Sequence, residues 1–429
     1  MKKRQRSKPV MPTTRREFLS LSAHGTGLVA LSAMAPGFLA DTVRALGADA
    51  ADKDGKIIVM IKLAGGCDGL NSVVPVNDDT YYDFRPQISI PKSDTLKIDD
   101  DFGFNPTMTG FDKLFKEGDL AIYRDVGYPN STHSHFSGQD FYERGGGFEF
   151  SGSGWLGRFL DAECPPDLAM KSPKPVATHI SRYLPITLRS KTPQPIFSML
   201  SSDVKRLMQR AVEEDAAARL LKEVVTTATD EKNEKIKYLN MAYMNAIVTE
   251  EKVRDVIANY QPDTEYGDYK LASDMRAVAA MISADMGNRV YSLDLGGFDT
   301  HSNHVQRHGE LMGEVAGAIE SFVTDLKAKK LGDKVIVMPF SEFGRRPYEN
   351  GSLGTDHGTN STFFVAGESV KGGLYGTQPT LPPDKRSDIP FTKTSIDFRQ
   401  MYATVLDKWL GTDADAIMGK SYDRLEFLG

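Results

Sequence analysis

Apolar runs of strand length recur along the chain, and segments with helical spacing of apolar residues separate them. The runs are rich in β-branched residues and carry few charges, so they predict buried strands. The predicted strands cover residues 56–63, 119–126, 288–295, 335–340 and 362–366.

Apolar residues at helical spacing lie between these strands. The predicted helices cover residues 106–117, 271–286, 306–330 and 397–410. Strands that alternate with helices across short Gly-rich loops favour a parallel sheet covered on both faces. The sequence therefore predicts an α/β fold, with a mainly parallel sheet and helices on both faces. The charged helical segment at residues 203–258 predicts an insertion or a lid.

The first 50 residues predict an export signal. A basic start leads to the pair Arg15 and Arg16, and no charged residue occurs between Phe18 and Ala40. This pattern resembles a twin-arginine signal, so we expect the twin-arginine translocation machinery as a partner and an exported, periplasmic or extracellular location. A retained N-terminal anchor is the alternative, because the apolar run is nearly long enough to span a bilayer. Residues 51–429 then form a single α/β domain.

Composition narrows the function classes. The chain of 429 residues is 40% hydrophobic and 26% charged, with a formal net charge of -6. Outside its N-terminus it has no sustained basic stripe, which argues against a nucleic-acid partner. No segment after the leader is apolar enough to cross a bilayer, so no stable span is expected after cleavage. The two cysteines are too few for a disulfide scaffold.

Acidic residues follow the predicted strands closely. In open parallel sheets, ligands bind beyond the carboxyl ends of the strands. Asp68 lies in a Gly-rich turn after the first strand, Asp299 follows the strand at 288–295, and Glu342 follows the strand at 335–340. For Asp68 alone, a turn residue that bonds its own backbone is an equal interpretation.

Histidines gather near the same strand ends. The chain has eight, and six lie in or beside these loops: His133, His135, His301, His304, His308 and His357. Carboxylate and imidazole together suit zinc, manganese or iron. Each one alone reads as an ordinary polar residue, and the spacing of His304 and His308 also fits a surface pair on a helix. The group as a whole, with Asp356 beside His357, predicts a metal or acid–base site.

Two further residues have alternative interpretations. Ser134 precedes a predicted helix and could cap it, or it could be a nucleophile aided by the positive helix end. Arg345 could hold an anionic group through two donors, or it could pair with Glu349 or Asp356.

Four motifs together are similar to a known family. They are Gly65-Gly66-Cys67-Asp68-Gly69-Leu70-Asn71, Gly297-Phe298-Asp299-Thr300-His301, Ser341-Glu342-Phe343-Gly344-Arg345 and Gly354-Thr355-Asp356-His357-Gly358. With the leader, they resemble the exported bacterial proteins of domain-of-unknown-function family 1501, in the alkaline-phosphatase-like superfamily that includes sulfatases. The resemblance implies a phosphatase-type site with two metals and a Ser or Thr nucleophile.

The resemblance assigns roles to individual residues. The implied metal ligands are Asp68, Asp299, His301, Glu342, Asp356 and His357. Ser134 is the implied nucleophile, and Ser72 is its rival. Phe343 stands where the superfamily often has a ligating His, so the number of divalent ions, one or two, stays open.

The function expected from these residues is an exported, metal-dependent hydrolase of phosphate or sulfate esters. Ser134 would attack an anionic ester, His135 or His133 would carry protons, and Arg345 would grip the non-bridging oxygens. The alternative is a binding or assembly protein of the cell envelope with a degenerate metal site. A carbohydrate-modifying esterase is a third interpretation, but the chain has no G-x-S-x-G motif to support it.

Overall fold

The computed structural model describes most of the chain after the predicted leader. The described residues are 55–147, 150, 152–164, 175–192, 194–208, 249–378, 381 and 394–429. The predicted export signal at residues 1–50 lies outside them, and so does most of the predicted helical insertion at residues 203–258. Within the described part of the chain, no helix combines the length and the apolar character needed to cross a membrane.

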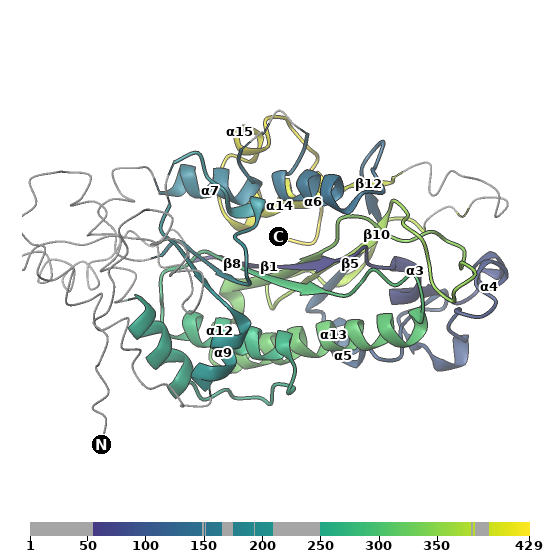
Figure 1. The fold of residues 1–429 in the computed structure, drawn as a ribbon, viewed down its shortest axis with the longest axis horizontal. Helices are drawn as coiled ribbons and strands as arrows, with labels where there is room; N and C mark the ends of the chain where they lie inside the picture. Colours follow the sequence, from purple (N-terminus) through teal and green to yellow (C-terminus); the bar gives the residue numbers. More distant parts are fainter. Residues whose placement is uncertain are drawn as a thin grey trace, which may run out of the picture.

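A large, mainly parallel sheet forms the centre of the described chain (Figure 1). Its strands are β1 (Ile57–Ala64), β5 (Leu120–Gly127), β6 (Ala177–Ile180), β7 (Ile196–Met199), β8 (Val290–Gly296), β9 (Val335–Phe340), β10 (Ser361–Ala366), β11 (Gly373–Tyr375) and β12 (Ile396–Asp397). The order is β11-β5-β10-β9-β1-β8-β6-β7, with β12 beside β5. Only β10 runs antiparallel to its neighbours in this described sheet. All the strands that the sequence predicted are confirmed.

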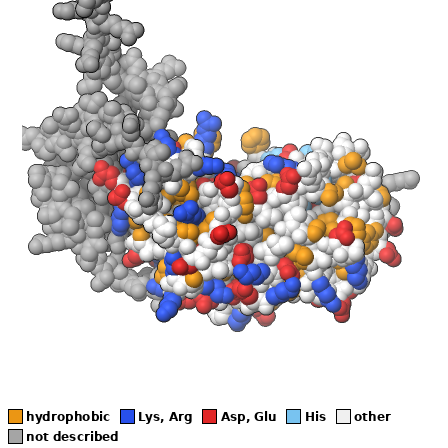
Figure 2. Space-filling model, turned by 90° about the horizontal axis from the view of Figure 1, so that it is seen from below, with side chains coloured by type: hydrophobic (Ala, Val, Ile, Leu, Met, Phe, Trp, Pro, Cys, Tyr) orange, Lys and Arg blue, Asp and Glu red, His pale blue; other side chains and the backbone are white. Residues whose placement is uncertain are grey.

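Helices cover both faces of the sheet, as predicted for the α/β class (Figure 1). One face carries α5 (Thr109–Glu117), α9 (Ser201–Met208), α12 (Lys270–Ser283) and α13 (His304–Ala328). The other carries α6 (His135–Arg144), α7 (Trp155–Glu163), α14 (Phe398–Thr404) and α15 (Ala414–Met418). Acidic and basic side chains are interspersed on the outer surface seen from below, which is typical of a solvated helix layer (Figure 2).

The central strand β1 shows why the predicted strands are so apolar. Successive side chains of a strand point to opposite faces of the sheet. Val59 and Ile61 belong to the core beneath α12 and α13, whereas Ile58 and Met60 belong to the core beneath α7 and α14. Because both faces of β1 are buried, the usual alternation of polar and apolar residues is absent, and the strand is a continuous apolar run.

Shorter elements lie beyond the carboxyl end of β1. They are α3 (Gly69–Ser72), β2 (Val73–Pro75), α4 (Asp79–Phe84), η1 (Lys92–Asp94), β3 (Leu96–Lys97) and β4 (Phe102–Phe104). The remaining elements are η3 (Ile186–Leu188), η4 (Gly332–Lys334) and η5 (Val405–Trp409). Strands β2, β3 and β4 form a small separate sheet among the described residues.

The register of three neighbouring strands brings their loops to one edge. β1 pairs in parallel with β8 and with β9, so that Ala64 lies opposite Gly296 and Lys62 lies opposite Phe340. The chain therefore leaves all three strands at the same level. The loops that begin at Gly65, Gly297 and Ser341 meet at this edge, as the sequence predicted.

Candidate metal centre

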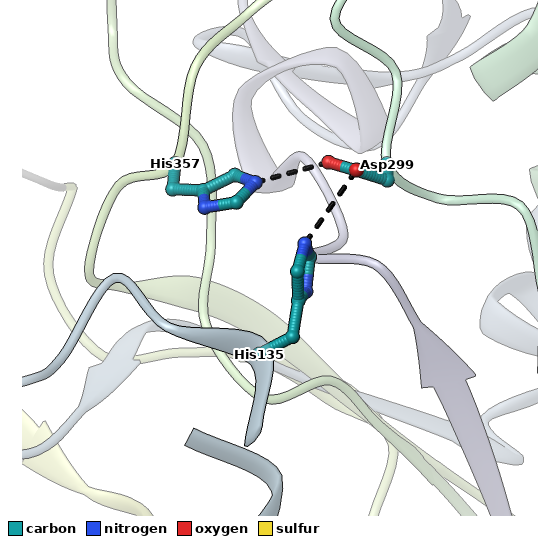
Figure 3. A group of neighbouring side chains, drawn as sticks. All are labelled: His135, Asp299 and His357. Carbon is teal, nitrogen blue, oxygen red and sulfur yellow. Dashed lines mark hydrogen bonds and ion pairs between the residues drawn. The ribbon is translucent and has the colours of Figure 1, made fainter. Parts of the chain in front are cut away.

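Three side chains from distant parts of the chain meet beyond these strand ends (Figure 3). Asp299 follows β8, His357 lies in the long loop after β9, and His135 is the first residue of α6. Each offers a ligand atom, and these atoms all lie within 4.8 Å of one another. His357 Nε2 is 3.0 Å from Asp299 Oδ1, and His135 Nε2 is 3.5 Å from Asp299 Oδ2.

A third imidazole joins the group. His301 Nε2 lies 3.1 Å from Asp299 Oδ1 and 3.1 Å from His357 Nε2. We call these four residues the imidazole cluster: His135, Asp299, His301 and His357. Three Nε2 atoms thus converge on one carboxylate.

The other nitrogen of each imidazole donates to a fixed oxygen. His135 Nδ1 lies 2.8 Å from Glu342 Oε1, and His301 Nδ1 lies 3.1 Å from Asp356 Oδ1. His357 Nδ1 lies 2.8 Å from the backbone oxygen of His133. A carboxylate or a carbonyl oxygen can only accept, so each Nδ1 carries the hydrogen. A neutral ring with this tautomer turns the lone pair of its Nε2 toward Asp299, which is how metal-binding imidazoles are usually held, whereas a ring that carries a second proton donates to Asp299 instead.

This arrangement fits a cation. The Nε2 atoms of His301 and His357 lie 3.1 Å apart, and both approach the anionic Asp299. Two unprotonated nitrogens so placed repel each other and the carboxylate, and either a proton or a divalent cation between them removes that repulsion. Nitrogen and carboxylate donors are the set that zinc and similar divalent metals take. Among the described residues, three members of the cluster, His135, Asp299 and His357, have ligand atoms close enough together to hold one ion.

The cluster is open to water. The side chain of Asp299 is 47% exposed and that of His301 is 46% exposed. Structural zinc sites are closed, whereas catalytic sites keep a position free for water or substrate. The exposure of the cluster therefore fits the catalytic type.

Charges and hydrogen bonds around the cluster keep its carboxylates ionised. Partial burial raises the pKa of Asp299, but hydrogen bonds from Arg345 and His357 outweigh burial and lower the pKa to about 2. Burial also raises the pKa of Asp356, and hydrogen bonds from Asn350 and His301 outweigh it, so the pKa of Asp356 is lowered.

Glu342 lies beneath the cluster rather than in it. Its side chain is buried, and Oε1 accepts hydrogen bonds from the amide of Gly65 at 2.9 Å and from Gln139 Nε2 at 3.1 Å, besides that from His135. Predicted as a ligand, Glu342 instead orients His135. Asp356 stands in the same relation to His301, and Asn350 holds its Oδ1 at 3.1 Å.

Arg345 is buried and bonded within the protein, whereas the sequence predicted that it holds the oxygens of a bound anion. Its Nε donates to the oxygen of Gly66 at 2.8 Å, and its Nη1 donates to the oxygen of Thr355 at 2.9 Å. Its Nη2 contacts the oxygens of Gly65 and Phe298 and lies 2.7 Å from Asp299 Oδ1. These bonds tie together the loops after β1, β8 and β9, of which the last two carry Asp299, His301 and His357, so Arg345 holds Asp299 in position.

Asp68 lies in the buried interior, in contrast to its predicted role as a metal ligand. Arg85 holds both carboxylate oxygens, with Nη1 at 2.5 Å from Oδ2 and Nη2 at 3.1 Å from Oδ1. His304 Nε2 lies 2.8 Å from Oδ2. Burial raises the pKa of Asp68, but Arg85 and His304 outweigh it and hold the pKa well below the usual value. We call Asp68 and Arg85 the buried ion pair.

The two candidate serines differ in access. Ser134 is exposed at the N-cap position of α6, where its side chain makes no capping hydrogen bond. Ser72, its rival, is fully buried and donates to the backbone oxygen of Asp68 at 2.7 Å. A bound ester could therefore reach Ser134 but not Ser72.

His304 and His308 form a buried pair and not the surface pair that their spacing allowed. His304 is 0% exposed and His308 is 1% exposed, and their rings stack with centroids 5.0 Å apart. His304 Nδ1 lies 2.7 Å from Thr300 Oγ1, and His308 Nε2 lies 3.1 Å from Ser72 Oγ.

Sequence reasoning missed two residues. Arg85 lies in an irregular segment where nothing in the pattern marks it as the partner of Asp68; the sole signal is a basic residue beside buried aromatic positions. Phe343, noted only as a departure from the family pattern, packs its ring 5.0 Å from that of His135 and 4.7 Å from that of His357. It forms the apolar wall of the cluster.

The fold and the cluster define an α/β protein with a candidate metal centre beyond the carboxyl ends of a mainly parallel sheet. Residues 55–426 match the family described as "Protein of unknown function (DUF1501)", and the chain belongs to this family. The resemblance to that family is confirmed. No curated protein matches the chain.

Solved structures to which the chain is similar share little sequence with it. A sulfatase from Pseudoalteromonas sp., PsFucS1, is 10% identical, with a TM-score of 0.36 over 94% of this chain and 78% of that chain. A protein in the alkaline phosphatase superfamily from Vibrio parahaemolyticus is 9% identical, with a TM-score of 0.39 over 90% of this chain and 78% of that chain. The C-terminal periplasmic domain of EcEptC from Escherichia coli is 12% identical, with a TM-score of 0.35 over 86% of this chain and 88% of that chain.

Proposed function

We propose that this protein is an exported, metal-dependent hydrolase of phosphate or sulfate esters. The observation that supports it best is the geometry of the imidazole cluster. Three Nε2 atoms converge on Asp299, while each Nδ1 is held by an oxygen that fixes the ring. A packed interior gains nothing from such an open group of imidazole nitrogens around one carboxylate, whereas a metal centre needs it.

The proposed ligands are the four residues of the imidazole cluster. They offer three nitrogens and one carboxylate, which suit one divalent ion such as zinc or manganese. When bound, such an ion supplies Lewis acidity, neutralises charge on an ester oxygen and lowers the pKa of a coordinated hydroxyl group.

Helix α6 supports the choice of an anionic ester. Its first residue, His135, belongs to the cluster, so the positive end of a ten-residue helix lies beside the metal site. Backbone N–H groups in the first turn of a helix favour phosphate and sulfate groups. The side chain of Ser134 does not cap this end, which leaves the turn open to a ligand.

Ser134 is the proposed nucleophile. Its Oγ would form a bond to phosphorus or sulfur, its proton would pass to His133, and the ester's alcohol would leave with its bonding electrons and be protonated. Water would then release the acid from Ser134. His133 is the proposed proton carrier because it is exposed beside Ser134. The other candidate, His135, has its Nδ1 bonded to Glu342 and its Nε2 turned toward Asp299.

The predicted export signal is the reason for proposing that the protein acts in the cell envelope. Residues 1–50 would direct the folded chain to the twin-arginine translocation machinery. That route suits a protein that binds its metal before it leaves the cytoplasm.

The test combines metal analysis with an ester panel. Purified protein should contain a divalent metal and hydrolyse an aryl phosphate or an aryl sulfate, and a chelator should abolish this hydrolysis. Asp299→Asn should lose both metal and hydrolysis. Asp140→Asn, which changes a partly exposed acid on α6 outside the cluster, is the matched control and should keep both.

Each failure has its own meaning. Full activity in Ser134→Ala would remove Ser134 from the nucleophile's role and leave the metal centre standing. Metal without hydrolysis of any ester would favour the alternative, a metal-retaining binding protein of the envelope. The packing of Phe343 against two cluster imidazoles is the observation that favours this alternative, because an apolar ring occupies ligand space there.

A further inference from the structure

A chain of buried contacts runs from the imidazole cluster into the interior. Thr300 lies between Asp299 and His301 in sequence, yet its side chain points inward and is 3% exposed. Its Oγ1 shares a 2.7 Å hydrogen bond with His304 Nδ1. The other nitrogen of that imidazole, Nε2, lies 2.8 Å from Asp68 Oδ2. The loop of the cluster is thereby connected to the buried ion pair.

The far end of this connection is rigid. Arg85 holds Asp68 through two donors and also donates to the backbone oxygens of Pro347 at 2.8 Å and Arg346 at 2.9 Å. Its side chain is fully buried. With Asn71 Oδ1, 2.6 Å from Nη1, the guanidinium has five acceptors, so it cannot move without losing several bonds at once.

Other contacts also hold the near end. Arg345 Nη2 donates to the oxygen of Phe298 at 2.9 Å, the amide of Thr355 donates to the oxygen of Thr300 at 3.2 Å, and Asn350 Nδ2 donates to the oxygen of His301 at 3.0 Å. Asn303, two residues further on, has a left-handed backbone with φ of 48°, a conformation that Asn adopts more readily than most residues. To these contacts the Thr300 hydroxyl adds a direct bond from the loop to a buried imidazole.

We infer that Thr300 is a positioning residue that ties the loop of Asp299 and His301 to the buried ion pair and thereby sets the cluster's affinity for a divalent metal. This inference rests on the proposed function, because it takes the imidazole cluster to be the metal site. If it holds, the buried ion pair contributes to metal binding indirectly, through His304 and Thr300. Removal of such outer partners typically weakens metal binding by roughly 10- to 100-fold.

The test is the dissociation constant for Zn²⁺, measured by competition with a chromogenic chelator on the metal-free full chain. Thr300→Val keeps the shape and removes the hydroxyl, and it should weaken binding by roughly 10- to 100-fold. Thr300→Ser restores the hydroxyl and should bind Zn²⁺ as tightly as the wild type. Thr300→Ala takes the place of the Val variant if that protein does not fold.

Thr404→Val is the matched control. It removes a buried hydroxyl that donates to the backbone oxygen of Gln400 at 2.6 Å on α14, at the opposite face of the sheet from α13. It should leave the affinity for Zn²⁺ unchanged. The inference is overturned if Thr300→Val binds like the wild type, if Thr300→Ser is as weak as Thr300→Val, or if Thr404→Val weakens binding equally. A wild-type chain that binds no Zn²⁺ would instead overturn the proposed function.

Discussion

Two aspartates that follow neighbouring parallel strands have opposite surroundings in this protein. Asp299, after β8, is 47% exposed and stands among three imidazoles. Asp68, after β1, is 1% exposed and holds a guanidinium. Both carboxyl groups have a lowered pKa. Their surroundings differ, because Asp68 is enclosed with the guanidinium of Arg85, whereas Asp299 meets the buried Arg345 on one side and imidazoles that leave room for an external cation on the other.

The two residues show that the role of an acid at a strand end depends on where its loop places it and on which side chains it meets there. The short elements α3 and α4 carry Asp68 and Arg85 into the interior, where a free carboxylate would be costly and a fixed partner is needed. The loop after β8 instead stays at the surface, where histidines can meet without permanent charge. The first acid supports the structure, and the second is free to bind a metal.

The largest expected effect is on stability, from Asp68→Asn. The substitution leaves Arg85 buried without its counter-charge, which typically costs about 3–5 kcal/mol. Urea unfolding of the metal-free protein would measure it. Asp299→Asn should cost less, because Asp299 is 47% exposed and its buried partner Arg345 keeps the backbone oxygens of Gly65, Gly66, Phe298 and Thr355 as acceptors. Equal losses in the two variants would contradict the contrast drawn between them.

The next largest effect is on metal binding, where Asp299→Asn should have a larger effect than Asp68→Asn. Asp299→Asn replaces the shared carboxylate of the cluster by a neutral amide, and the affinity for Zn²⁺ should fall by more than roughly 100-fold, since loss of an outer partner alone costs up to that much. Isothermal titration of the metal-free protein measures it. Asp140→Asn should titrate like the wild type, and a normal titration of Asp299→Asn would remove Asp299 from the ligand set.

A pH effect comes third and belongs to the buried region. Burial, followed by the charge of His304, lowers the pKa of His308 to about 3, whereas an unfolded histidine titrates near 6.5. The unfolded chain thus binds the extra proton first, and stability falls as the pH drops from about 6.5 toward 3. For His308 alone the loss between pH 7 and pH 5 is about 2 kcal/mol.

Urea unfolding of the metal-free chain at the two pH values tests this loss. His308→Gln, which cannot titrate, should flatten the pH dependence by that amount. An unchanged slope would show that His308 is not the group responsible.

The smallest effect is expected from Glu342→Gln. The amide oxygen can still accept from His135 Nδ1, but it holds the ring without a charge, so the affinity for Zn²⁺ should fall by roughly 10-fold. Glu310→Gln, an exposed acid on α13, is the control for the loss of one negative charge. If both variants bind Zn²⁺ alike, the carboxylate of Glu342 does not tune the cluster.

The sequence predicted the strands and the edge where the cluster forms, because apolar periodicity reports which faces are buried. It also placed Asp299, His301 and His357 at one edge, since they follow β8 and β9, which lie on either side of β1 and run parallel to it. It could not predict that Asp68 turns inward, because that depends on Arg85 reaching it from an irregular segment. The direction of Arg345 was equally hidden, since spacing does not say whether a side chain leaves a loop toward water or toward four backbone carbonyls.

The most direct measurement is the metal content of the protein exported by its own leader, determined by elemental analysis beside Asp299→Asn. The proposed centre predicts about one divalent ion per wild-type chain and almost none in the variant. A wild-type chain that carries no more metal than Asp299→Asn, even after incubation with excess Zn²⁺ or Mn²⁺, would contradict it.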